Sequence, residues 1–318
     1  MATSSSYNFN VTGSDIITEA LGLVGVYSPG ESIDASESAD VLRTLNMMLK
    51  SWQMMNMGIW LNKELNLFLG NSQIKYDLGP TGDHCAITAV KTELAAAAAS
   101  GATSLTIDAT TGFGDTFDRN GIITAVTPAA AGAITLTGAL VASGIATLSG
   151  ERRILVYAAG HESARSFSIV VQDSASVAVT ESITGPNAGT VHSASAYRTI
   201  TSVTVDAATA GNIEVGQVGD PIGIEQDNNT LHWTYIANAL SATPSLVTAL
   251  TGAAAIDNHV YSYTIRAPRP TQIVECRLHN ASNNDIPINV EGRLYYQSLS
   301  LKTQTGTPNQ VYYDKQLT

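Results

Sequence analysis

The chain has 318 residues, which is long enough for about two domains. Only 14% of the residues are charged while 44% are hydrophobic, a composition too apolar for a disordered protein. No run of 18 apolar residues predicts a membrane-spanning helix. Residues 1–13 have neither the basic head nor the apolar stretch of a signal peptide.

The net charge of −11 is concentrated in the middle of the chain. Residues 92–264 contain 14 acidic residues, five arginines and no lysine, so this segment alone carries −9. Such a surface repels nucleic acid, and it is equally typical of an ordinary acidic domain. The two cysteines, Cys85 and Cys276, are too few for a disulfide framework, so we expect free, buried thiols.

Two helices are expected near the N-terminus. Thr12 and Asp15 have the spacing of a capping box, and Gly25 can end the apolar segment that follows, which has so little polar face that we expect it to be largely buried. Residues 34–57 predict a longer amphipathic helix, in which Asp34 and Glu37 form a second capping box. Its apolar positions recur every three or four residues, at Val41, Leu42, Leu45, Met48, Leu49 and Trp52.

The remainder of the chain reads mostly as strands. Residues 59–79 predict two short strands around Gly70–Asn71, and residues 86–264 consist of short β-like runs separated by turns, typical of a sandwich or small barrel. The run TSLTID at 103–108 recurs as TSVTVD at 201–206, which indicates two related β units with a third between them, or a chance match in a threonine-rich segment. After residue 266 we expect a short helix around 273–278, a strand at 286–291, a helix at 292–302 and a strand at 310–315.

No catalytic or nucleotide-binding signature is present, and the six histidines are scattered without metal-ligand spacing. The carboxylate pairs Glu37–Asp40 and Asp115–Asp118 fit a solvated helix face and a turn better than an acid–base pair. We therefore predict no catalytic, metal-binding or cofactor-binding residues, and no enzyme activity.

Five of the six methionines fall close together in and after the second helix. Methionine side chains are flexible and adapt to irregular partner surfaces, although they also fill cores. With the aromatic residues nearby and near the C-terminus, they give a candidate interface. Its residues are Met47, Met54, Met55, Met57, Trp60, Tyr312 and Tyr313.

The two chain ends resemble the head-to-tail adaptor family of short-tailed bacteriophages, also called tail accessory or packaged-DNA stabilisation proteins. At the N-terminal end the resemblance rests on DIITEALGLVGV (15–26), PGE (29–31) and ADVLRTLNMMLKSW (39–52), in that order. At the C-terminal end it rests on Arg269-Pro270, Tyr295 or Tyr296, Leu301-Lys302, TGTP (305–308) and YYD (312–314). The middle departs from the simplest members, in which the first hairpin passes almost directly to the helix after Arg269-Pro270.

This resemblance implies an α+β fold. Residues 1–85 and 265–318 would form a small helical adaptor core with short strands, and residues 86–264 would be an inserted all-β domain, Ig-like or a small sandwich. Insertion is tolerated where a surface loop lets both ends of a domain leave close together. The resemblance leaves open whether the insertion faces the channel, the capsid or the fibres. Family members usually continue with a further strand and an extended tail beyond the position of Thr318.

The resemblance further implies a structural protein at the head–tail junction of a virion, assembled in the host cytoplasm. About twelve copies would form a closed ring below the portal protein, so the candidate interface would contact another subunit or the portal. DNA would pass through the central channel without sequence-specific binding, and a nozzle or hub protein of the tail would dock below. No membrane is involved.

Two other functions are kept as alternatives. The β region would be a glycan or host-surface binding module if Trp233, Tyr235, Tyr261 and Tyr263 were exposed for stacking on sugars. A cell-wall hydrolase would need two carboxylates at a defined separation, and no pair in the sequence is placed that way.

Overall fold

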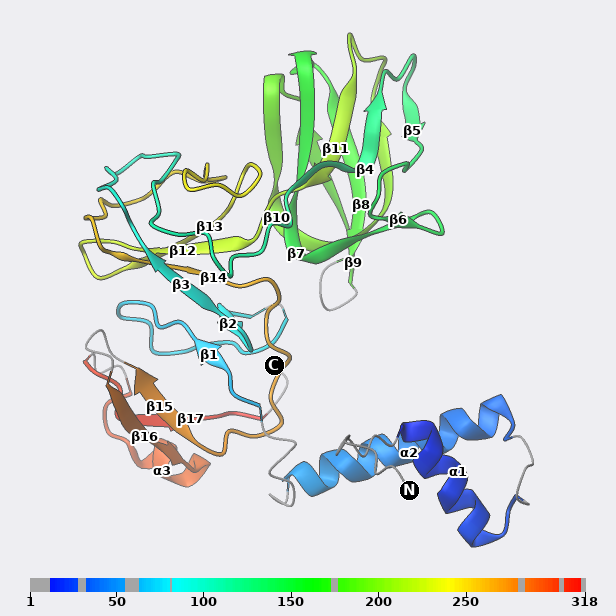
Figure 1. Cartoon of the computed structure of the whole chain (residues 1–318), viewed down its shortest axis with the longest axis vertical. Coiled ribbons are helices and arrows are strands. Elements are labelled where there is room, and N and C mark those ends of the chain that lie inside the picture. The colour runs from blue at the N-terminus through cyan, green and yellow to red at the C-terminus, as the bar shows by residue number, and fades with distance from the viewer. Residues whose placement is uncertain are drawn as a thin grey trace, which may run out of the picture. The chain divides into compact units, whose positions relative to one another are not determined.

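The computed structural model describes residues 12–27, 33–54, 63–80, 82–172, 177–279, 284–302 and 306–315. The chain divides into two compact units, and Figure 1 shows the elements of both. The terminal unit consists of Met1–Lys63, Thr271–Ser298 and Pro308–Thr318. The central unit consists of Glu64–Pro270 and Leu299–Thr307.

The helices of the terminal unit begin and end where local signals place them. Helix α1 (Gly13–Val24) has the full capping box of Thr12 and Asp15, and Gly25 ends it at φ 78°, a left-handed conformation that favours glycine. Helix α2 (Ala35–Met54) begins after Asp34, whose carboxylate accepts the backbone N–H of Ser36 at 2.8 Å. Glu37 does not complete a second capping box, because its carboxylate accepts the hydroxyl of Tyr27 instead.

The C-terminal part of the terminal unit is a three-stranded sheet with one short helix. Strand β16 (Asp285–Glu291) pairs antiparallel with β15 (Cys276–His279) and parallel with β17 (Gln310–Tyr312). Helix α3 (Arg293–Ser298) lies between β16 and β17 in the sequence. The helix expected around 273–278 is therefore wrong, since Cys276–His279 pairs with β16 as a strand.

The central unit contains two large antiparallel sheets, which we call the eight-stranded and four-stranded lobes, and a small two-stranded sheet. The eight-stranded lobe has the order β4-β11-β7-β10-β8-β9, with β5 on β10 and β6 on β7. Its strands are β4 (Asp118–Val126), β5 (Gly132–Ile134), β6 (Val141–Ala142), β7 (Ile145–His161), β8 (Ser166–Gln172), β9 (Ala178–Thr184), β10 (Asn187–Val205) and β11 (Ile213–Gln217). The four-stranded lobe has the order β13-β12-β14-β3. Its strands are β3 (Val90–Glu93), β12 (Pro221–Glu225), β13 (Leu231–Tyr235) and β14 (His259–Ser262).

The two-stranded sheet shows how the segment after α2 differs from expectation. Strand β1 (Asn66–Leu67) pairs with β2 (Cys85–Ala86), so the two strands predicted around Gly70–Asn71 do not pair with each other. The TSLTID and TSVTVD runs also differ in structure. Residues 201–205 lie in β10, whereas residues 103–108 form only isolated bridges at Ser104 and Ile107.

The expected α+β fold on a small helical base is wrong. The structure is mostly β, with 41% strand and 13% helix. The apolar side chains of the β segments form hydrophobic cores of their own, one in each lobe of the central unit. The β segments therefore dominate the fold and do not depend on a helical base. The first core includes Ile122, Ile154, Phe167, Ile200 and Ile213, all fully buried between the strands of the eight-stranded lobe.

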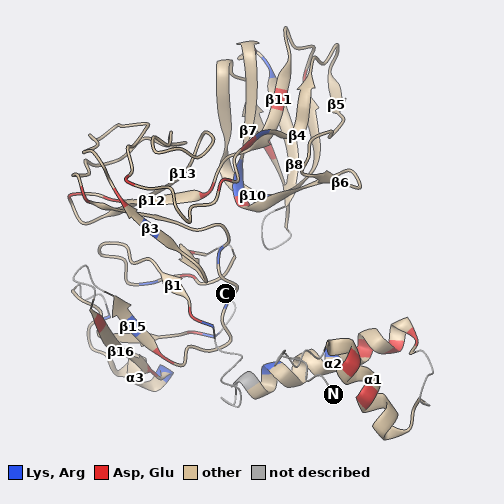
Figure 2. Cartoon of the chain, in the orientation of Figure 1, with Lys and Arg blue, Asp and Glu red and all other residues tan. Residues whose placement is uncertain are grey.

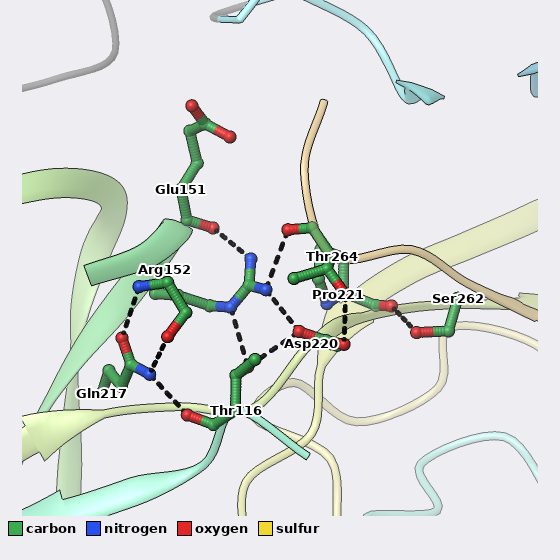
Figure 3. A network of polar contacts seen from close by, with 9 residues as sticks. Thr116, Glu151, Arg152, Gln217, Asp220, Pro221, Ser262 and Thr264 are labelled. Carbon is green, nitrogen blue, oxygen red and sulfur yellow. Dashed lines mark hydrogen bonds and ion pairs between the residues drawn. The ribbon is translucent and has the colours of Figure 1, made fainter. Parts of the chain in front are cut away.

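An ion pair without access to solvent joins the two lobes (Figure 3). Arg152 in β7 is 1% exposed and Asp220, which precedes β12, is 0% exposed. The guanidinium also donates to Thr116 Oγ1 at 3.2 Å, to Glu151 O at 3.1 Å and to Thr264 O at 2.9 Å. The carboxylate of Asp220 also accepts the hydroxyls of Thr116 at 2.7 Å and Thr264 at 3.0 Å. Both charges are therefore surrounded by hydrogen-bond partners, which offsets the cost of removing them from water.

Close packing around this pair leaves no room for a side chain at two glycine positions, Gly114 and Gly150. A Cβ atom at Gly114 would lie 2.2 Å from Asp220 Oδ2, and one at Gly150 would lie 2.7 Å from the carbonyl oxygen of Thr264. Next to the ion pair, Leu155, Val218 and Tyr235 form a third cluster of buried apolar side chains. Polar and apolar contacts together fix the junction of the two lobes.

Removing one partner of the buried ion pair should be costly. We expect Arg152→Met to lower the free energy of unfolding by about 3–5 kcal/mol, because the carboxylate of Asp220 is left buried without a cation. The double variant Arg152→Met/Asp220→Leu should cost less than the sum of the two single variants. Urea unfolding at pH 7 measures the free energy of unfolding of Arg152→Met, Asp220→Leu and the double variant.

The control is Lys75→Met. Lys75 and Asp77 form an ion pair of 3.9 Å in the same unit, but their side chains are 79% and 75% exposed. We expect almost no change in the free energy of unfolding, because water screens exposed pairs. A cost for Arg152→Met as small as that of the control would contradict a stabilising role for the buried pair.

Candidate functional site

The described part of the terminal unit fully buries very few of its apolar side chains. Among the described residues, Ile17 is its one buried hydrophobic residue, and every other buried hydrophobic residue belongs to the central unit. The expectation that the first helix is largely buried is therefore wrong. Although α1 packs against α2, only Ile17 of its apolar side chains is buried and Leu21 is half-buried.

The exposed apolar surface extends over both N-terminal helices. On α1, Leu23 is 81% exposed and Val24 is 77% exposed. On α2, Leu42, Met48 and Trp52 are each more than 40% exposed, next to the partly buried Val41, Leu45 and Leu49. We call Ile16, Leu23, Val24, Leu42, Met48 and Trp52 the hairpin surface. Figure 2 shows that uncharged residues make up most of both helices.

The structure places only part of the predicted interface. Met47 is 59% exposed on α2 but lies outside the hairpin surface. Met47 lies on the side of the helix away from Val41 and Leu45. Residues three or four positions apart share a face, and Met47 is not at that spacing from either of them. Met55, Met57 and Trp60 lie outside the described residues, as does the side chain of Met54.

The two C-terminal tyrosines of the predicted interface lie at β17. Tyr312 ends this strand and stacks on Tyr296 of α3, with ring centroids 4.9 Å apart and an interplanar angle of 15°. Tyr312 and Tyr313 are half-buried. Nearby, Leu294 at the start of α3 is 83% exposed. This sheet thus resembles the helical hairpin in having large apolar groups at its surface.

Of the aromatic residues considered for sugar stacking, Trp233 and Tyr263 pack against each other, and the half-buried Tyr261 packs against Phe68. Trp233 stacks on His84 with centroids 3.9 Å apart and an interplanar angle of 7°. Its other neighbours include Gly223, where an added Cβ would lie 2.7 Å from the indole ring. Tyr235 is 9% exposed and Tyr263 is 3% exposed. The best-placed ring face for a sugar, that of Trp233, is therefore occupied by His84.

Burial sets the protonation of this aromatic cluster. Burial, with a smaller contribution from the charge of Arg266, lowers the pKa of His84 to about 3, so the imidazole is neutral at neutral pH. Burial raises the pKa of Tyr263 to about 12, which keeps its hydroxyl protonated. The Tyr263 hydroxyl accepts Arg266 Nε at 3.2 Å and lies 2.6 Å from His84 Nδ1, to which it can donate its proton.

Within the described ranges, no group of three or more His, Cys, Asp or Glu side chains is arranged to hold a metal ion. No described helix combines the length and the hydropathy needed to cross a membrane. Cys85 and Cys276 are both free, and Cys85 is buried while Cys276 is only half-buried. Burial raises the pKa of the Cys85 thiol to about 11, so it is a poor nucleophile.

No protein-family model, curated protein or solved structure matches this chain. The site is therefore assigned from its own geometry. Sequence reasoning did not identify Leu23 and Val24 as surface residues, because their pattern is the same whether or not a partner covers them. It also missed the contact of His84 with Tyr263, which are separated by 179 positions.

The neutral state of His84 makes stability depend on pH. Its folded pKa lies below the ordinary value of 6.5, so protonation is harder in the folded than in the unfolded state. The contribution of neutral His84 to the free energy of unfolding is fully present above pH 6.5 and is lost as the pH falls toward 3. Relative to His84→Gln, the native protein should lose on the order of 2 kcal/mol of unfolding free energy between pH 7 and pH 5.

The comparison needs a histidine that is exposed in the same unit. His161 is exposed at the end of β7, so His161→Gln should keep the pH dependence of the native protein. Urea unfolding at pH 5, 6 and 7 measures each variant. Parallel profiles for the native protein and His84→Gln would show that His84 is not held neutral by burial.

Proposed function

We propose that this protein is a structural subunit that assembles with further copies of itself through the terminal unit. The observation that supports this most directly is the distribution of buried side chains, since the described part of the terminal unit buries only Ile17. The central unit, in contrast, buries two complete cores. The two units therefore differ in what they need from a partner.

The physical argument rests on the cost of exposed apolar surface. Each large side chain that moves from water into an apolar contact contributes roughly 1.5–3 kcal/mol when fully buried. Contiguous apolar patches on monomers are usually small, and larger ones mark interaction sites. Leu23 and Val24, each more than three-quarters exposed on one helix, are the strongest example on the hairpin surface.

The most specific form of this proposal is a head-to-tail adaptor. The motifs at the two ends of the chain support it, and their residues lie largely in the terminal unit. A ring of about twelve subunits would then be closed by heterologous contacts, in which two different surfaces of neighbouring copies meet. The portal protein and a tail nozzle or hub protein would bind its two faces, and DNA would pass through it.

Assembly is tested by adding charge to the hairpin surface. We expect Leu23→Glu and Met48→Glu each to raise the concentration needed for half-assembly at least tenfold, because a carboxylate cannot be buried there without a partner. Mass photometry over a range of concentrations, with and without the portal protein, measures the distribution of species. Electron microscopy of the same samples shows whether they are rings.

The matched control is Thr18→Glu. Thr18 is exposed on α1, so the substitution adds the same charge to the same helix at a polar position. We expect the control to assemble as the native protein does. A native protein that stays monomeric alone, with portal and in assembled particles would refute the proposal. Equal behaviour of Leu23→Glu and Thr18→Glu would exclude the hairpin surface as the interface.

A further inference from the structure

A pocket of about 380 Å³ opens where two paired segments of the central unit separate. Val90 of β3 pairs with Ser262 of β14, and Ala86 pairs with Arg266 a few residues away. Residues 87–89 and 263–265, which lie between these two points, belong to no strand, and the pocket lies between them. Its volume falls within the range of small-molecule sites.

The walls of the pocket are mainly apolar. Ile87, Val90, Ile265 and Pro268 line it, together with the ring of Tyr263. Gly112 also lines it, at φ +84°, and a Cβ there would lie 3.0 Å from Val90. A side chain at this position would therefore be strained and crowded, and its absence keeps the pocket open.

One cation, Arg266, lines the pocket without a carboxylate partner. Its Nε donates to the hydroxyl of Tyr263, but its two terminal nitrogens have no hydrogen-bond acceptor among the residues that the structure describes. The acidic group that acts on it from further away is Glu151, which is 3.8 Å from Arg198. Neither terminal nitrogen is among the buried side-chain atoms that lack a partner, so both reach solvent and can donate to a ligand that enters the pocket.

The immediate neighbours of Arg266 are neutral. The phenol of Tyr263 and the imidazole of His84 both carry no charge at neutral pH, because burial raises the pKa of the first and lowers the pKa of the second. Two buried carboxylates of the central unit have cations of their own, since Asp220 pairs with Arg152 and Glu151 lies 3.8 Å from Arg198. Among the described residues, Arg266 is therefore the one charged side chain that lines the pocket, and it lies next to mainly apolar walls.

We propose that this pocket binds a small monocarboxylate with an apolar body, whose carboxylate pairs with the terminal nitrogens of Arg266. A planar guanidinium presents two parallel N–H donors that match the two oxygens of a carboxylate. The apolar part of the ligand would contact Ile87, Val90 and Ile265. This site is independent of the assembly proposed above, since it lies wholly within the central unit.

Matched ligands test the proposal in the full-length protein. Hexanoate and hexan-1-ol share an apolar body and differ in charge, and titration calorimetry measures both. We expect hexanoate to bind at least tenfold more tightly than the alcohol, and Arg266→Gln to abolish this difference. N-acetylleucine and N-acetylleucinamide form a second pair that mimics the carboxyl end of a peptide. Tighter binding of hexanoate identifies a free aliphatic acid as the ligand, and tighter binding of N-acetylleucine identifies a chain terminus.

Two controls keep the test decisive. Arg266→Lys retains the charge without the planar fork, so it should keep a weakened preference for the acid even if Arg266→Gln does not fold. Thermal unfolding of each variant shows whether the central unit is intact. The proposal is overturned if neither acid binds the native protein, if acid and neutral ligand bind equally, or if a folded Arg266→Gln retains the preference.

Discussion

The buried ion pair of Arg152 and Asp220 is the contact on which the architecture of the central unit depends. It joins Arg152 in the middle of β7 to three residues just outside strands, in one polar network. These are Thr116 before β4, Asp220 before β12 and Thr264 after β14, which are far apart in the sequence. Two charges removed from water are tolerated only when their remaining donors and acceptors are satisfied. Here Thr116 and Thr264 each contact both the guanidinium and the carboxylate, so the loops that carry them are held in one position.

The two units show opposite solutions to the burial of apolar surface. In the central unit, side chains such as Ile122 and Ile222 are completely covered by neighbouring strands. In the terminal unit, helix pairing and a three-stranded sheet leave Leu23 and Leu294 more than four-fifths exposed. Secondary structure is regular in both units, so the difference lies in packing. This contrast is the basis for proposing that assembly involves the terminal unit rather than the central unit.

Sequence patterns predicted local structure well where the signal was local. The capping box of Thr12 and Asp15 and the glycine at position 25 mark α1 correctly, because each acts within one turn of the helix. Prediction failed at 276–279, since pairing with β16 decided the conformation of that segment. No periodicity marks Arg152, Asp220 or Arg266, whose roles depend on contacts across the fold. Amphipathicity likewise predicted the apolar faces of the helices but not what covers them.

Ile17 is the one buried hydrophobic side chain among the described residues of the terminal unit, and this has a consequence for the order of events during folding and assembly. Local opening of a segment costs little free energy when few apolar contacts are lost. In a lone subunit, the backbone amides of α1 would therefore exchange with solvent long before those of β7 or β10. The central unit could form first, and in the proposed assembly the chain ends would gain their protection only on contact with another copy. The timing of maturation would then be set by the supply of partner surface rather than by the folding speed of the ends.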